Sequence, residues 1–259
     1  MRARLRPKLT LLITLLGVCP LSWGLEQSMQ DQVKEVTPYQ TAIRLPLSQT
    51  SNGIDGYLEL RQDGRLTQKL TGRLWGTGDV DIDDDPVLTV FKNDPPRNAV
   101  IRMVDHRGKV VESKELERPL AKLRTEHLYG DSRLTYLLTV DYSAGFGSYS
   151  GPITRLAEVT GGRLKWIEST ELKTGKTEQI SLMESLKTTW KFVDGLDGKG
   201  NQILLAQCRP DWSSAKEDPV FITTFARFYF DGAKWVVKAR VVKGFNEFDQ
   251  GFPSRRNFP

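Results

Sequence analysis

Five aspartates within seven residues form the densest group of potential metal ligands in the chain. They are Asp79, Asp81, Asp83, Asp84 and Asp85. Calcium prefers oxygen ligands, and alternating aspartates in an extended loop can direct several carboxylates to one ion. The helix-loop-helix calcium pattern is not met, because its glycine and final glutamate positions hold Asp84 and Val90. We interpret the segment as a solvated acidic loop, with a calcium site at Asp79, Asp81 and Asp83 as the alternative.

A second acidic loop lies within residues 192–205, whose sequence is FVDGLDGKGNQILL. This segment resembles the Asp/Gly loop and following strand of FG-GAP, or integrin-type, propeller repeats. In that family the loop often binds calcium between two strands, so the resemblance implies a calcium site at Asp194, Asp197 and Asn201. Lys199 departs from the pattern, because it stands where a further acidic ligand is expected.

Aromatic side chains in expected loops are candidates for ligand binding. The glycine-rich segment 143–151 (SAGFGSYSG) carries Phe146 and Tyr149, and Tyr142 directly precedes it. Trp75 and Trp212 lie near Gly, Pro and Asp residues. These rings could stack on a sugar or a peptide, whereas the alternative is a long hairpin loop with rings that cap the edge of a core.

Motifs for catalysis are incomplete in this sequence. Ser148 and Ser150 lack the flanking glycines of a hydrolase nucleophile elbow. The only two histidines, His106 and His127, do not have zinc-ligand spacing. A glycosidase with paired carboxylates stays open as an alternative, because the distance between two carboxylates is invisible in a sequence.

The elements that would hold these residues are expected to be strands joined by tight turns. Apolar and polar residues alternate in short runs from Thr37 onward, and Asp-Gly or Gly-Gly pairs separate many of them. We expect an all-β, antiparallel, hairpin-rich and propeller-like fold, with a large β-sandwich or two small β domains as alternatives. One or two short helices are also expected, one of them at residues 115–128.

The first 24 residues have the pattern of a secretory signal peptide. Four basic residues precede the apolar run Leu9–Val18, which is too short to span a bilayer, and a small-residue cleavage site follows. Residues 25–36 are a polar lead-in, and 37–259 are expected to form a single domain with a possible seam near 113–128. Acylation at Cys19 is the less favoured alternative, because Val18 does not fit a lipoprotein signal.

Removal of the signal peptide changes the charge balance of the chain. The full chain has 37 Lys+Arg against 32 Asp+Glu, and loss of four basic residues leaves 33 against 32. This balance argues against nucleic acid as a partner. Only Cys208 would remain, so no intrachain disulfide is expected.

Together these features predict a periplasmic or secreted bacterial protein without a transmembrane segment after cleavage. We expect a non-enzymatic binding module whose partner is an envelope glycan, peptide or protein, with no cofactor other than a possible calcium ion. An extracytoplasmic hydrolase of glycosidase type is the alternative.

Overall fold

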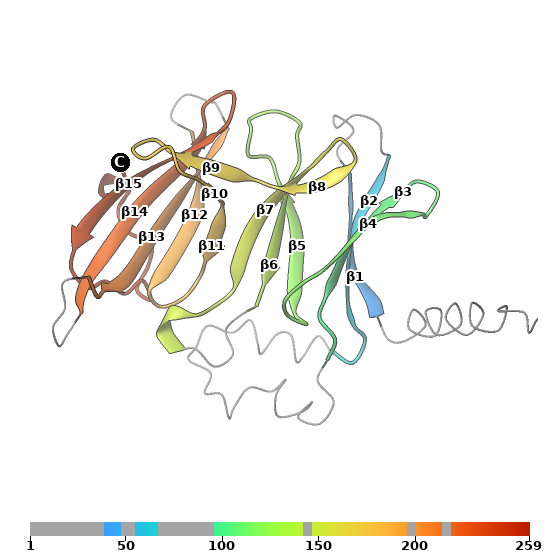
Figure 1. The fold of residues 1–259 in the computed structure, drawn as a ribbon, viewed down its shortest axis with the longest axis horizontal. Helices are drawn as coiled ribbons and strands as arrows, with labels where there is room; N and C mark the ends of the chain where they lie inside the picture. Colours follow the sequence, from blue (N-terminus) through green and yellow to red (C-terminus); the bar gives the residue numbers. More distant parts are fainter. Residues whose placement is uncertain (1–38, 48–54, 67–95, 142–146, 196–199, 214–218) are drawn as a thin grey trace, which may run out of the picture. The chain divides into compact units, whose positions relative to one another are not determined.

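The structure is a computed structural model that describes residues 39–47, 55–66, 96–141, 147–195, 200–213 and 219–259 (Figure 1). The described residues form fifteen strands and two short 3-10 turns, η2 (Gly147–Tyr149) and η3 (Arg255–Asn257). All strand pairs are antiparallel except one, which confirms the all-β, antiparallel prediction. A propeller-like or sandwich arrangement is not confirmed. Residues 1–24, predicted to be a signal peptide, and residues 25–36, predicted to be a polar lead-in, lie outside the described residues.

Three sheets make up the described part of the chain. The first has four strands in sequence order: β1 (Tyr39–Pro46), β2 (Gly56–Asp63), β3 (Val100–Asp105) and β4 (Val110–Glu115). The second has the order β11-β7-β6-β5, and β8 also pairs with β7. Its strands are β5 (Ala121–Glu126), β6 (Thr135–Val140), β7 (Ile153–Thr160), β8 (Arg163–Trp166) and β11 (Ser181–Met183).

The third sheet has six strands in the order β10-β9-β15-β14-β13-β12. They are β9 (Glu168–Glu171), β10 (Thr177–Gln179), β12 (Thr188–Asp194), β13 (Asn201–Asp211), β14 (Val220–Phe230) and β15 (Trp235–Lys243). Strands β12 to β15 form a meander, and β9 adds to β15 in the one parallel pairing.

The β9–β10 hairpin connects the second and third sheets. It lies in the chain between β8 and β11. Strands β8 and β11 both pair with β7, and the β9–β10 hairpin between them joins the third sheet instead. The chain leaves the second sheet at Ile167, whose N–H donates to the Leu156 carbonyl, and returns at Ile180, whose N–H donates to the Ile167 carbonyl. Two sheets are therefore held together by main-chain hydrogen bonds of a single hairpin.

The core is divided into layers, and the second sheet contributes to two of them. One cluster packs Leu58, Ile101 and their neighbours against Tyr136 and Leu138 of the second sheet. Another cluster combines Leu156 of the second sheet with residues of the third, including Ile203 and Phe228. Strand β6 has the run Thr135-Tyr136-Leu137-Leu138, and all four residues are buried because both faces of this sheet are covered.

The C-terminal strap, residues 244–259, covers part of the other face of the third sheet. Phe258 is buried against Leu204, Ala206 and Phe225, and Phe248 and Phe252 pack on the same cluster. The rings of Phe225 and Phe258 meet edge to face with centroids 5.4 Å apart. The strap thus supplies the apolar cover that this part of the sheet would otherwise lack.

The helix predicted at residues 115–128 is wrong. The segment ends β4 and then forms β5, where Ala121 and Leu123 are buried while Lys122 and Arg124 are exposed. Leu116 and Leu120, whose spacing suggested a helix, extend the neighbouring ladders by main-chain hydrogen bonds to Ala99 and Asp141. Cross-strand pairing overrides the helical spacing here, and the segment is where the chain passes from the first sheet to the second.

Candidate functional site

Seven of the eleven predicted site residues lie outside the described part of the chain. They are Trp75, Asp79, Asp81, Asp83, Tyr142, Phe146 and Asp197. The structure places the other four, Tyr149, Asp194, Asn201 and Trp212, on three separate segments. Only Asp194 and Asn201 are brought directly together, as the last pair of the β12–β13 ladder.

The pair formed by Asp194 and Asn201 has a structural role in the second acidic loop. The Asn201 N–H donates to the Leu128 carbonyl at 3.0 Å, and its side-chain amide donates to the His127 carbonyl at 3.4 Å. Gly200 has φ +88°, and a Cβ there would lie 2.5 Å from the Leu128 carbonyl oxygen. The described residues hold no group of three His, Cys, Asp or Glu side chains suited to a metal ion.

Exposed aromatic rings gather at one end of the third sheet. Trp212 directly follows β13 and is 64% exposed. Phe221 lies at the start of β14, where its carbonyl accepts a hydrogen bond from Gly244, so Phe245 of the strap lies beside it. The Phe221 and Phe245 rings meet edge to face at 4.9 Å, and Phe245 is 51% exposed. We call Trp212, Phe221 and Phe245 the aromatic end.

A buried cation supports the exposed ring of Phe245. The Lys187 side chain is 5% exposed, its Nζ lies 3.6 Å from the centroid of the Phe245 ring, and it forms an ion pair with Glu247. A buried ammonium needs such a counter-ion, and the face of an aromatic ring attracts it further. Phe245 is thereby fixed on its inner side while its outer side faces solvent.

Tyr149, the other described aromatic candidate, is 40% exposed in η2. It lies before β7 of the second sheet, whereas Trp212 follows β13 of the third. The sequence analysis missed Phe221 and Phe245. Their only sequence trace is the spacing of phenylalanines in the strap, at 245, 248, 252 and 258, in a segment too polar to form a strand.

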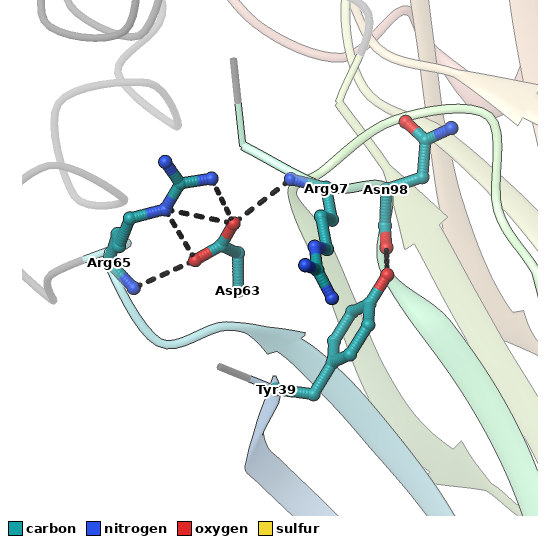
Figure 2. A network of polar contacts seen from close by, with 5 residues as sticks. All are labelled: Tyr39, Asp63, Arg65, Arg97 and Asn98. Atoms are coloured by element: carbon teal, nitrogen blue, oxygen red, sulfur yellow. Dashed lines mark hydrogen bonds and ion pairs between the residues drawn. The ribbon is translucent and has the colours of Figure 1, made fainter. Parts of the chain in front are cut away.

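The most strongly bonded carboxylate belongs to Asp63, at the end of β2 (Figure 2). Arg65 donates to it from its main-chain N–H and its guanidinium, with Nη2 2.6 Å from Oδ2, and the Arg97 N–H donates at 3.0 Å. The Arg65 hydrogen bonds lower the pKa of this buried carboxyl to about 2. Beside it, the Tyr39 hydroxyl donates to the Asn98 carbonyl at 2.8 Å, and burial raises the pKa of Tyr39.

Four other aspartates also have lowered pKa values, so their carboxyls favour the charged form. In Asp105, Asp131 and Asp231, main-chain N–H groups of the following turn lower the pKa, and Ser213 does the same for Asp211. A glycosidase acid requires the opposite shift, a raised pKa that keeps a proton on the carboxyl. These described carboxylates are therefore suited to fixing turns and not to donating protons.

Tyr129 is the described phenol with the largest shift. Burial raises its pKa to about 12, and its hydroxyl donates to Glu158 at 3.1 Å. The Arg133 guanidinium lies 3.9 Å from the centroid of its ring, and the Phe230 ring contacts it edge to face. This cluster joins the second and third sheets and holds a neutral hydroxyl, so it too is a structural contact.

The arrangement as a whole offers exposed rings that adjoin paired strands, and carboxylates held in their charged form. In the part of the chain that the structure describes, no helix has the length and apolar character needed to cross a membrane. Comparisons with protein-family models, curated proteins and solved structures give no match for this chain, so its function has to be argued from its own geometry.

Proposed function

We propose that this protein is an exported binding module of the bacterial cell envelope that contacts a glycan, peptide or protein through its aromatic end. The observation that carries the proposal is the exposure of Trp212 and Phe245 at the end of a sheet whose strands are paired over their full length. A large ring that is exposed and held in place loses little conformational freedom when a ligand covers it.

The supporting contacts explain why the Phe245 ring stays in place without a ligand. Phe245 is held between Phe221 and Lys187, and Phe248 ties the strap to the Leu186 carbonyl by its main-chain N–H. Loops 79–85, 143–151 and 194–201 are proposed as further contact regions. Tyr149 is the described aromatic residue of these loops.

Export is the part of the proposal that rests on the first 24 residues. Cleavage after Gly24 would give a protein that begins at Leu25, in the periplasm or the medium. Cell fractionation followed by mass spectrometry of the N-terminus tests this. A full-length chain in the cytoplasm would contradict export, and an acyl chain on Cys19 would replace the soluble form by a lipoprotein.

The binding proposal is tested by co-sedimentation of residues 25–259 with isolated cell-wall sacculi and with neutral insoluble glycan. Trp212→Ala and Phe245→Ala should each weaken binding about tenfold, since loss of one stacked ring costs on the order of 1 kcal/mol. Leu172→Ala is the matched control, because Leu172 is equally exposed but lies in the β9–β10 turn. Equal binding by all variants would refute a role of the aromatic end, and hydrolysis of the glycan would favour the enzyme.

A further inference from the structure

Four side chains of β14 and β15 form a cationic surface on the same face of the third sheet that the strap covers elsewhere. Arg227 and Tyr229 lie on β14, and Lys238 and Arg240 lie on β15. The ring contacts place them together: Arg227 and Lys238 approach Tyr229 at 5.4 and 5.8 Å, and Arg240 lies 5.8 Å from the Phe225 centroid. We call these four residues the cationic face. Strands β14 and β15 run side by side in Figure 1.

The strand register makes two of the cations direct neighbours. Arg227 pairs with Lys238 across the ladder, and Arg240 pairs with Phe225 one step further along. Like charges in a direct cross-strand pair destabilise a sheet. The chain therefore maintains an arrangement here that opposes its own folding.

No described residue balances this charge. Arg227, Lys238 and Arg240 form no ion pair with any part of the chain that the structure describes, and Arg227 Nε is buried without a hydrogen-bond partner there. Arg65 and Lys187, in contrast, have carboxylate partners in Asp63 and Glu247. An uncompensated group of three cations is accordingly a site for an external anion.

We propose that the cationic face binds the acidic groups of an anionic polysaccharide. This inference goes beyond the proposed function, because it assigns a second binding surface, separate from the aromatic end, and names the chemical class of its ligand. A guanidinium can bind a carboxylate through two hydrogen bonds, and Lys238 and Arg240 add charge about 7 Å apart along β15. The Tyr229 ring between the cations offers an apolar surface to the C–H groups of a sugar ring.

A lipid surface is a weaker fit for this face. Interfacial binding combines cations with several apolar side chains that enter the membrane. The exposed Leu172 adjoins β15, and the exposed Val241 belongs to the opposite face of the sheet. The aromatic end adjoins the start of β14, whereas Tyr229 lies near the end of this strand. A polymer that carries repeated acidic groups fits a flat row of cations better, because it needs no apolar insertion.

The experiment measures binding of residues 25–259 to polygalacturonate, with neutral dextran as the uncharged probe, at low and high ionic strength. The triple variant R227Q/K238Q/R240Q should lose about tenfold or more in affinity at low ionic strength and most of the salt dependence. The control K109Q/R163Q/K165Q removes the same charge from exposed positions in the turn before β4 and on β8. Circular dichroism establishes that both variants are folded.

Each outcome bears on the proposal. Selective loss in the first triple variant, with Trp212→Ala unaffected, supports it. Equal loss in both triple variants would mean nonspecific attraction and would overturn it. The proposal would also be overturned if the first triple variant lost binding to phosphatidylglycerol vesicles but not to polygalacturonate. Binding that appears only after Asp79, Asp81, Asp83, Asp84 and Asp85 are changed to Asn would also overturn it, because the face would then be covered by the chain's own acidic loop.

The inference and the proposed function fail in different ways. If polygalacturonate does not bind but sacculi bind through Trp212, the cationic face is refuted and the binding module stands. If the protein binds neither polygalacturonate nor dextran nor sacculi, the binding function itself is refuted.

Discussion

The turn around Asp63 and the β14–β15 face around Arg227 both place charges beside aromatic rings, yet they differ in what balances the charge. Asp63 accepts hydrogen bonds from Arg65 and from the main chain of Arg97, so its charge is neutralised inside the fold. Arg227 instead faces Lys238 across the ladder. The first region stabilises the scaffold, whereas the second leaves charge available to a partner.

Replacement of Asp63 should give the largest effect on stability. Asp63→Asn removes the carboxylate and leaves the donors of Arg65 and Arg97 poorly matched, so the free energy of unfolding should fall by about 3 kcal/mol. Urea denaturation followed by tryptophan fluorescence measures the change. Asp105→Asn is the control, because Asp105 also accepts turn N–H groups but is only partly buried, and its loss should be much smaller.

The pH dependence of stability should reveal the same carboxyl. The pKa of Asp63 is about 2 in the folded chain against an ordinary value of 3.8, so its contribution is complete above about pH 4 and is lost as the pH falls through 2. The contribution is about 2 kcal/mol. Urea midpoints from pH 6 to pH 2 measure it, and Asp63→Asn should flatten the acid limb of the curve. An unchanged acid limb in that variant would contradict the pairing.

The Lys187–Glu247 pair should respond unequally to loss of its two members. Glu247→Gln leaves a buried ammonium without its counter-ion and should cost about 2 kcal/mol, whereas Lys187→Met leaves a half-exposed carboxylate in water and should cost less. The ranking is measured by urea unfolding of both variants. A larger loss for Lys187→Met would mean that packing against Phe245 outweighs the ion pair.

The smallest effect should have the opposite sign. Lys238→Glu converts the like-charged pair with Arg227 into an attractive one and should raise the free energy of unfolding by about 0.5 kcal/mol, while it abolishes polyanion binding. Lys165→Glu is the mirror control, because Lys165 faces Glu158 across β7 and β8, and its replacement should destabilise. If both variants changed the free energy of unfolding in the same direction, the cationic face could not be said to oppose folding.

Local chemistry explains which parts of the fold are visible in the sequence. The turns at Thr160–Gly162 and Asp231–Lys234 contain the Gly-Gly and Asp-Gly pairs that were expected between strands, and both are confirmed as hairpin connections, because a tight turn depends on residues that are adjacent in the chain. The β9–β10 hairpin was not foreseen as an insertion between sheets. Its pairing with β15 joins residues more than sixty positions apart, and no short pattern encodes that partner.

The candidate site also contains residues that could be predicted from the sequence and residues that could not. Exposure of Trp212 and Tyr149 could be expected from the loop chemistry around them, and the structure agrees. Phe245 and the cationic face could not be expected, because Phe245 depends on how the strap returns to the sheet and Arg227 meets Lys238 only through the register of β14 and β15. Alternation gives the face of a side chain but not its cross-strand neighbour.

The hairpin that leaves β7's edge at Ile167 and returns at Ile180 has a mechanical consequence. Strands β9 and β10 belong to the third sheet, with β9 paired to β15, while β8 and β11 are paired to β7 of the second sheet. Separation of either sheet would therefore strain the main-chain hydrogen bonds of the other. The two sheets should behave as one cooperative block, with amide exchange in β7 and β15 governed by the same opening event. A ligand seated on β14 and β15 would then slow exchange in β7 as well, although no ligand touches that strand.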